Sequence, residues 1–225
     1  RVLQAQQVAV LPDRVGAGAH QRRDAEEEAE LGGRLAREAQ HQRTHDGRAR
    51  AAGAGDHREA LDDTDTDFVL NNLSNDNSRV HPEQYRLTTP ASPHFAAEVD
   101  GVNIALDDFS LPETDRPLIV EGAGGLMVPL NEKDLIIDLI LHLELPVILV
   151  SGIYLGSINH TLLSVEALRM RHIQIAGIVF NGPPNEATES IILKHTGLPV
   201  ILRINEEEVL DADVILRYAG EVVLG

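Results

Sequence analysis

Residues 145–181 read LPVILVSGIYLGSINHTLLSVEALRMRHIQIAGIVFN, and this stretch decides the fold class. Two short apolar runs, residues 147–150 and 175–180, flank a helical pattern over residues 159–170. Both runs are continuously apolar rather than alternating, which is typical of strands that are covered on both faces. The stretch therefore predicts a parallel sheet in a three-layer α/β domain.

The same pattern continues on either side of this stretch. Further apolar runs occupy residues 118–120 and 200–204, and helical patterns cover residues 135–143 and 186–195. Pro146 and Pro199 stand at the start of two expected strands, where a missing N–H costs least. We therefore expect one α/β domain over residues 62–225.

Residues 1–60 differ in composition from the rest of the chain. They hold ten Arg and ten acidic residues but no Ile, Phe, Tyr, Met, Lys, Ser or Asn, so the formal net charge of −17 lies in residues 61–225. A stretch without isoleucine or aromatic residues has few means of forming a core. We expect residues 1–61 to be unrelated to the domain and to lie outside its core. They are either a disordered extension or a wrong-frame reading of GC-rich DNA.

Composition also excludes several classes of function. The chain has no cysteine, which excludes disulfides, thiolate metal sites and a cysteine nucleophile. Aromatic residues make up 3%, and the acidic balance argues against a nucleic-acid partner. No apolar run approaches the length of a membrane span, about 18 residues, and no signal-peptide pattern opens the chain. We expect a soluble, cytoplasmic protein without a membrane partner.

Ligands of parallel sheets bind at the carboxyl ends of the strands, so the residues after each run are the candidates. Glycines there let backbone N–H groups approach an anion, and a helix N-terminus adds partial positive charge. Glu121 follows one run directly and is placed as a Mg²⁺ ligand would be in a nucleotide site. For any single loop, a tight turn with a solvated carboxylate explains the residues equally well. Three such loops at one edge favour a ligand site.

Three segments resemble the dethiobiotin synthetases, the ATP-dependent carboxylases of biotin biosynthesis. They are EGAGGLMVPL at residues 121–130, LGSINHTLL at 155–163 and AGIVFN at 176–181, and residues 64–70 and 90–94 also fit. The resemblance spans about residues 62–210 and implies a fold like that of the P-loop NTPases. It also implies a homodimer that joins CO₂ to 7,8-diaminopelargonate as a carbamate, phosphorylates it with ATP, and closes the ureido ring.

The resemblance implies a role for each matching residue. Asp65 and Glu121 would ligate Mg²⁺. The nucleotide would lie near the backbone of Gly122, Ala123 and Gly124, with its adenine at Asn181, Gly182, Ile204, Asn205 and Glu206. The diamine would lie near Ser92, and its carboxylate would be held by Ser157 and Asn159 across a dimer interface. On the residues alone, Ser92 and Pro93 could be a plain turn, and Asn159 a plain N-cap.

The phosphate-binding part of the family pattern is absent. The first lysine of the chain is Lys133, so the lysine and threonine of a GTDTxxGKT loop have no counterpart, nor has the first strand. Residues 8–11 with Gly16 and Gly18 imitate a strand and glycine loop, but no Gly-Lys-Ser/Thr ending follows. No catalytic residue is therefore recognisable, and we expect impaired activity. The alternatives are a non-catalytic remnant that dimerises or weakly binds nucleotide, and a related amide-forming ATPase of cofactor biosynthesis.

Overall fold

The computed structural model of the chain describes residues 8–10, 69–70, 80–114 and 117–223. Asp65 and residues 16–18 lie outside these ranges. Residues 117–223 hold most of the sheet and four of the helices that cover it.

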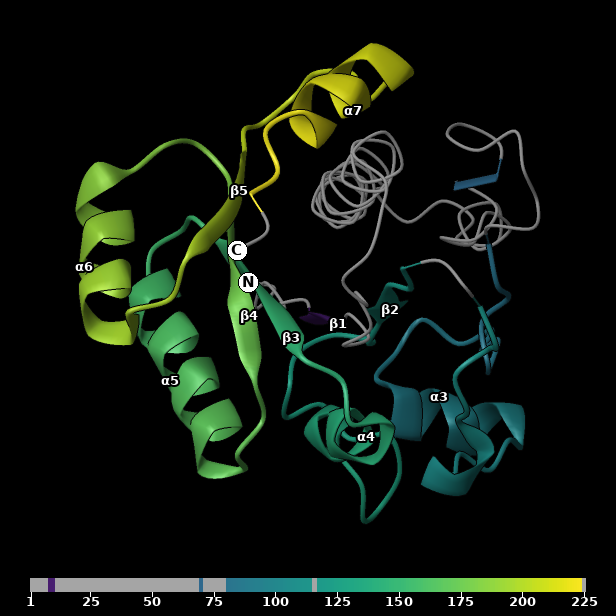
Figure 1. The fold of residues 1–225 in the computed structure, drawn as a ribbon. Helices are drawn as coiled ribbons and strands as arrows, with labels where there is room; N and C mark the ends of the chain where they lie inside the picture. The colour runs from purple at the N-terminus through teal and green to yellow at the C-terminus, as the bar shows by residue number, and fades with distance from the viewer. Residues whose placement is uncertain (1–7, 11–68, 71–79, 115–116, 224–225) are drawn as a thin grey trace, which may run out of the picture.

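Four strands form where the apolar runs predict them (Figure 1). They are β2 (Val120–Glu121), β3 (Val147–Gly152), β4 (Ile175–Asn181) and β5 (Val200–Ile204). β3 pairs in parallel with β4, and β4 in parallel with β5. These pairings confirm the predicted parallel sheet.

A fifth strand, β1 (Val8–Val10), lies between β2 and β3, so that the sheet order is β2-β1-β3-β4-β5. β1 runs antiparallel to both neighbours, with Ala9 opposite Glu121 on one side and Ile148 on the other. The expectation that residues 1–60 lie outside the domain core is therefore wrong for the backbone of these three residues. The physical reason is that β2 and β3 both present backbone groups that need partners, which any extended segment can supply.

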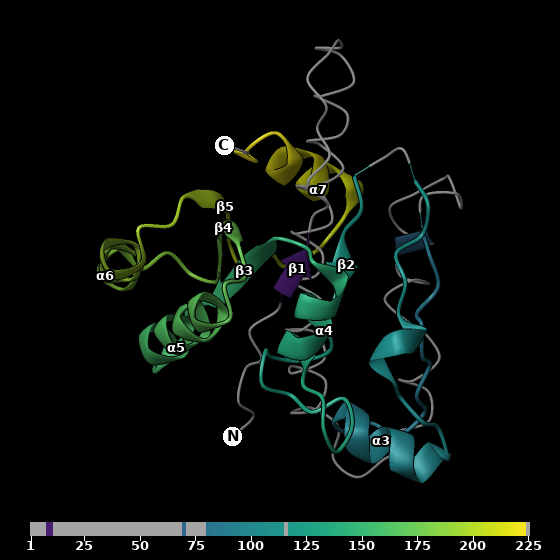
Figure 2. The ribbon, with the colours of Figure 1, turned by 60° about the horizontal axis from the view of Figure 1, so that its bottom comes forward.

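Helices cover the two faces of the sheet and make three layers, as predicted (Figure 2). α5 (Ser157–Met170) and α6 (Glu186–Thr196) lie on one face, where Phe180 of β4 packs in a buried cluster with Ile192 of α6. α7 (Ala212–Ala219) lies on the other face, where Val179 of β4 packs in a cluster with Tyr218. The alternating side chains of β4 thus serve two cores.

The remaining helices pack between the loop after β2 and the start of β3. α4 (Ile136–Leu143) contributes four buried side chains to a cluster that also contains Val147, at the start of β3. α3 (Pro93–Asp100) joins this cluster through Ala97, and a short 3₁₀ helix, η3 (Leu106–Asp108), follows it.

The sequence analysis identified neither α3 nor α7. The sequence nevertheless contains a start signal for α7, the N-cap residue Asp211. Its carboxylate accepts a hydrogen bond from the Val214 N–H at 2.9 Å. The buried positions of α7 are Ile215, Tyr218 and Ala219, the last two spaced three and four residues from the first. This N-cap and this spacing are a normal helix signature.

Candidate functional site

The carboxyl ends of four strands meet at one edge of the sheet, as the sequence predicts. β2 and β3 are both antiparallel to β1 and therefore parallel to each other. Two backbone hydrogen bonds extend the parallel pairing past the strand ends: Ile153 N–H donates to the Asn181 carbonyl and Gly182 N–H to the Ile204 carbonyl, both at 2.9 Å. The loops after β3, β4 and β5 thus begin as one continuous surface.

The loop after β2 is a tight glycine turn against α4. Gly124 has φ +76°, and a Cβ there would lie 2.9 Å from Cγ2 of Val128, so the turn requires glycine. A Cβ on Gly122 would lie 3.1 Å from Cγ2 of Ile136. Packing alone therefore explains these two glycines, and their approach to a nucleotide stays a prediction. Glu121 and Ala123 are exposed beside the turn.

The amino end of α5 is the second element of the site. The helix begins at Ser157 rather than at the predicted Asn159, because Gly156, at φ +105°, is its N-cap and allows the chain to turn two residues earlier. Asn159 is therefore an exposed residue of the first turn and not an N-cap. The Ser157 N–H donates to the Tyr154 carbonyl at 3.0 Å, but no side chain in the described structure caps this end, so the partial positive charge of the helix end is not neutralised by a capping group.

Three buried hydroxyl groups lie at this end of the helix. Two of them are hydrogen-bonded to each other, and the third has no partner among the described residues. Ser151 of β3 and Thr161 share a hydrogen bond of 2.7 Å. Ser157 is 1% exposed, and its Oγ has no hydrogen-bond partner among the described residues. A buried hydroxyl without a partner is costly, about 1–3 kcal/mol, and calls for an explanation. A bound polar ligand is one.

A tyrosine and a histidine fasten the turn that leads into α5. The Tyr154 hydroxyl and Nδ1 of His160 lie 2.7 Å apart, and the two rings are tilted with centroids 5.8 Å apart. Burial raises the pKa of Tyr154 above its ordinary value. The pair thus holds Gly156 and its neighbours in place from both sides of the turn.

The third element of the site is formed by the ends of β4 and β5. Asn181 is buried at the end of β4, next to Gly182 at φ +138°, and Ile204 is buried opposite Asn181 in the ladder. Asn205 and Glu206 follow and are exposed. A buried side-chain amide beside exposed backbone is an arrangement that can recognise the edge of a heterocyclic base.

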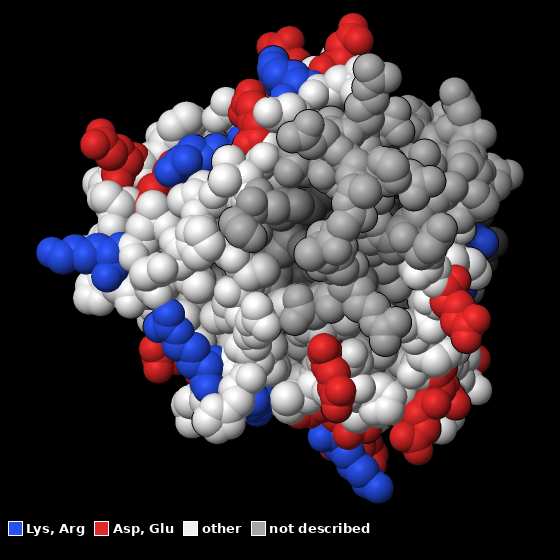
Figure 3. Space-filling view, viewed as in Figure 1, with Lys and Arg blue, Asp and Glu red and all other residues white. Residues whose placement is uncertain are grey.

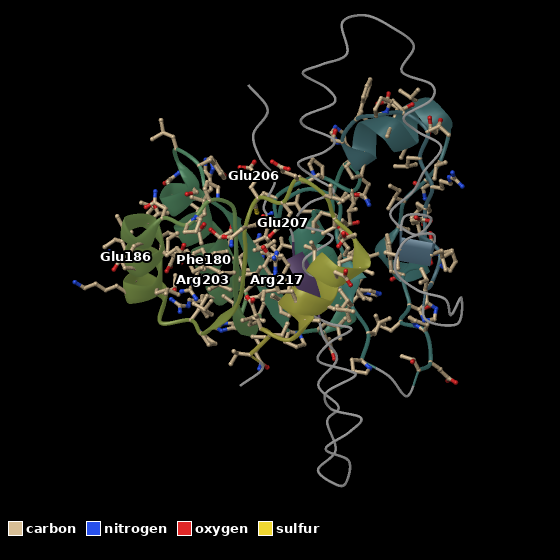
Figure 4. The ribbon with its side chains drawn as sticks, turned by 90° about the horizontal axis from the view of Figure 1, so that it is seen from above. Phe180, Glu186, Arg203, Glu206, Glu207 and Arg217 are labelled. Atoms are coloured by element: carbon tan, nitrogen blue, oxygen red, sulfur yellow. The ribbon has the colours of Figure 1, made fainter. Side chains whose placement is uncertain are left out.

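The two arginines near the end of β5 are both engaged by carboxylates (Figure 4). Arg203 Nε donates to Glu189 at 2.7 Å and lies over the Phe180 ring, on the side of α6. Arg217 donates to Glu207 at 2.5 Å on the side of α7. On the face shown in Figure 3, the Lys and Arg side chains of the described residues lie scattered among acidic ones. The described part of this face therefore offers no ready cluster of cations for a polyphosphate.

Ser92 is the N-cap position of α3, and Pro93 is the first helical residue. Its Oγ lies 3.1 Å from Nδ1 of His94, and the His94 N–H donates to the Pro129 carbonyl at 3.3 Å. The start of α3 therefore lies against the segment that follows the glycine turn. The structure brings Ser92 toward the β2 side of the site, and its contact with a substrate stays a prediction.

Of the two predicted magnesium ligands, the structure describes one. Glu121 ends β2 at the carboxyl edge, while Asp65 lies outside the described residues. Within the described ranges, no group of three or more His, Asp or Glu side chains is placed to hold a metal ion. A two-carboxylate site completed by a nucleotide would not form such a group, so the metal site stays a prediction.

Known proteins share this arrangement of segments. A family model described as an AAA domain matches residues 53–214. The ATP-dependent dethiobiotin synthetase BioD of Cytophaga hutchinsonii is 49% identical over 160 residues, which are 71% of this chain and 78% of that protein. This chain belongs to the dethiobiotin synthetase family.

Other dethiobiotin synthetases show the same degree of similarity. Those of Christiangramia forsetii and Rhodopseudomonas palustris are 48% and 46% identical, over 71% and 68% of this chain and 76% and 72% of their own lengths. The family confirms the resemblance found in the sequence and the enzyme class, an ATP-dependent ligase. The AAA match begins inside residues 1–61, and the domain boundary at residue 62 stays a prediction.

Sequence reasoning gave no role to four residues that the structure places in or beside the candidate site. They are Tyr154, His160, Glu207 and Tyr218. His160 and Glu207 stand in or beside the family segments without a role, and the two tyrosines carried no signal, because their partners lie on other elements. The described helices include none that combines the length and the apolar character needed to cross a bilayer.

Proposed function

We propose that this chain carries the substrate- and base-binding parts of a cytoplasmic dethiobiotin synthetase. The reaction is the ATP- and Mg²⁺-dependent carboxylation of 7,8-diaminopelargonate by CO₂, followed by ureido ring closure. The observation that carries the proposal is that the segments Glu121–Gly125 and Gly156–Asn159 follow β2 and β3, two strands that run in the same direction and end at the same edge of the sheet. Together with Asn181, they provide a carboxylate, a helix N-terminus and a base-binding amide.

The amino end of α5 is the proposed site of the substrate carboxylate. The helix dipole and a helix end without a side-chain cap in the described structure favour an anion there. The buried Ser157 hydroxyl, which has no partner among the described residues, supports this role because a carboxylate oxygen would accept its proton. Asn159, exposed in the first turn, would add a side-chain donor.

Magnesium and nucleotide would bind on the β2 and β4 sides of the edge. Glu121 fits a Mg²⁺ site because its exposed carboxylate offers the hard oxygen donors that this ion prefers, and Asp65 is the proposed second ligand. The ion would supply charge neutralisation to the transferred phosphoryl group. Asn181, with Gly182 and the residues 204–206, would hold the adenine.

A homodimer is part of this proposal. Leu163 and Met170 on the outer side of α5, and Leu155 just before the helix, are at least 60% exposed. Asn159 lies on the same side of the helix by its spacing from Leu163, as does the exposed Glu166. Large exposed apolar side chains around a substrate-binding turn are typical of an interface between two copies of a chain. Sedimentation of Leu163→Glu should report a monomer where the unchanged chain is a dimer.

The phosphoryl-transfer step is proposed to be impaired. No lysine precedes Lys133, and Arg203 and Arg217 are both paired with carboxylates. Lysine and backbone groups of a phosphate loop normally stabilise the transition-state charge, and losing several kcal/mol slows a reaction by roughly 10³-fold or more. We expect no ADP formation above background from the diamine, bicarbonate, Mg²⁺ and ATP. ADP formation that Glu121→Gln abolishes would refute the impairment.

A non-catalytic remnant is the second candidate, and the same missing lysines favour it. Binding of Mg²⁺·ADP by calorimetry, in the absence of turnover, would support this remnant. The dethiobiotin synthetase relatives favour both candidates over an amide-forming ATPase. Translating the encoding DNA upstream of Asp62 in all frames would test residues 1–61. A GTDTxxGKT pattern in another frame would identify them as a reading error.

A further inference from the structure

We propose that Tyr218 of α7 is a positioning residue that sets the preference of this site for adenine over guanine. The inference rests on the proposed function, because it assumes that the base binds beside Asn181 and the segment 204–206. It concerns a side chain that touches neither the base nor the phosphates. Tyr218 acts by fixing the backbone of the segment that follows β5.

The position of β5 at the edge of the sheet creates the need for such a residue. β5 is the outermost strand, so its backbone N–H and carbonyl groups that point away from β4 have no further strand of the described sheet to pair with. The chain solves this with its own C-terminal region: Val223 N–H donates to the Ile201 carbonyl at 3.0 Å, near the start of β5. At the other end of the strand, Asn205 N–H donates to the Tyr218 hydroxyl at 2.9 Å. The Tyr218 hydroxyl thus accepts the hydrogen bond that a carbonyl of a further strand would otherwise accept.

The same hydroxyl also fixes the next carboxylate. Tyr218 donates to Oε1 of Glu207, and Arg217 donates to the same oxygen while its guanidinium lies 4.9 Å from the centre of the Tyr218 ring. The Tyr218 side chain is 2% exposed, so its hydroxyl is tied at both of its hydrogen-bonding functions in a buried setting. Figure 4 shows Glu207 and Arg217 together on the side of α7. Asn205 and Glu207 are thereby held to one rigid point.

The hydrogen bonds of the Tyr218 hydroxyl with Asn205 and Glu207 form a clamp, and this clamp is continuous with the predicted base site. Ile204 accepts from Gly182 N–H at 2.9 Å and is followed directly by Asn205. One path of hydrogen bonds therefore runs from Gly182 through β5 to Tyr218. Burial, then the Glu207 hydrogen bond, raises the pKa of Tyr218 above its ordinary value, so the hydroxyl stays protonated and keeps donating at neutral pH.

Rigid backbone is what base discrimination needs. Adenine and guanine exchange donor and acceptor at N1 and at the C6 substituent, so a site selects between them only if its own donors and acceptors cannot shift to suit either. A fixed polar group that is left unpaired by the wrong base penalises it strongly. The clamp on Asn205 and Glu207 would hold the exposed segment 205–206 in the one arrangement that pairs with adenine.

The test compares Tyr218→Phe with Tyr85→Phe in the full chain. Tyr85 is a matched control, because its hydroxyl also donates to a carboxylate, that of Asp108, and accepts from a backbone N–H, that of Ala105 at 3.4 Å. Dissociation constants of ADP and GDP with Mg²⁺ are measured by calorimetry. We expect Tyr218→Phe to lower the ratio of the GDP to the ADP constant about tenfold, and Tyr85→Phe to leave it within twofold.

Hydrogen exchange of the Asn205 amide provides a second measurement that does not depend on ligand. We expect its exchange to quicken at least tenfold in Tyr218→Phe and not in Tyr85→Phe. Unchanged protection, or an unchanged preference for ADP in a chain that prefers ADP, would overturn the inference alone. A starting chain without any preference for ADP would overturn the proposed base site and the inference with it.

Discussion

The two sides of the sheet are built differently. From β3 to β5, strands of five to seven residues pair in parallel and are covered by α5, α6 and α7. From β2 to β1, strands of two and three residues pair antiparallel. The strands and helices of the first side can be predicted from the sequence almost residue by residue. The second takes its central strand from a region whose composition predicts no core at all.

The difference places the folding core and the proposed binding loops on one side of the sheet and the proposed phosphoryl site on the other. The β3–β5 side holds the largest buried side chains and the loops proposed for adenine and the substrate carboxylate. The β2 side holds Glu121 and the glycine turn, where phosphoryl chemistry would take place. The proposed impairment would therefore affect the phosphate side and leave the folding core and the proposed binding loops in place. Four experiments test this division, in order of decreasing effect.

Proline in a central strand should separate the two sides most clearly. Ile178 N–H donates to the Pro199 carbonyl at 2.9 Å in the middle of the parallel sheet, so Ile178→Pro removes this bond and should abolish the cooperative unfolding transition. Ala9→Pro in β1 should cost only about 1 kcal/mol, as for one lost hydrogen bond. Circular dichroism and urea unfolding check both. Equal loss of fold would show that β1 is as essential as β4.

Truncating the β3 core should come next. Leu149 is fully buried at 0% exposure, and Leu149→Ala should lower the free energy of unfolding by about 2–5 kcal/mol. Leu141→Ala, at 40% exposure on α4, is the matched control and should cost less than about 1 kcal/mol. Chemical denaturation measures both values. Similar costs would mean that β3 is not the centre of the core.

Close packing of β4 on β5 predicts a smaller loss. A Cβ on Gly177 would lie 2.7 Å from Cγ1 of Ile201 and 2.9 Å from the Pro199 carbonyl oxygen, so Gly177→Ala should cost about 1–3 kcal/mol. At Gly220, after α7, the nearest atom to a new Cβ is 3.6 Å away, and Gly220→Ala should be close to neutral. Thermal unfolding of the two variants measures this difference. Equal midpoints for Gly177→Ala and Gly220→Ala would argue against close packing of β4 on β5.

The α3 region should show a weak pH dependence of its own. Hydrogen bonds, first from the Thr88 N–H and then from the Thr89 hydroxyl, hold the pKa of Asp100 below its ordinary value. A lowered folded-state pKa stabilises the fold above the ordinary pKa, and this contribution is lost as the pH falls through the folded pKa. Asp100→Asn should therefore be less stable than the unchanged chain at neutral pH and equal to it in strong acid. A pH-independent difference would assign the effect to packing.

Several parts of the site were readable because their signals are local. The apolar runs after Pro146 and Pro199 predict β3 and β5, and the residues behind them predict the carboxyl edge. Gly124 and Gly156 mark turns that only positive φ allows, which the structure confirms. The start of α5 was placed two residues late, because Gly156 as N-cap gives a weaker signal than Asn159.

The sequence by itself determined the parallel β3–β5 sheet, the edge at which its loops gather and the family to which the chain belongs. It did so because continuous apolar runs and glycine turns are properties of neighbouring residues. The tertiary structure alone decided that β1 lies between β2 and β3, that Ser157 is buried without a partner among the described residues, and that the Tyr218 hydroxyl accepts a hydrogen bond from the Asn205 N–H. These outcomes depend on which polar groups remain unpaired once the sheet has formed. The residues that pair with such groups lie far away in the chain, so local sequence patterns do not indicate them.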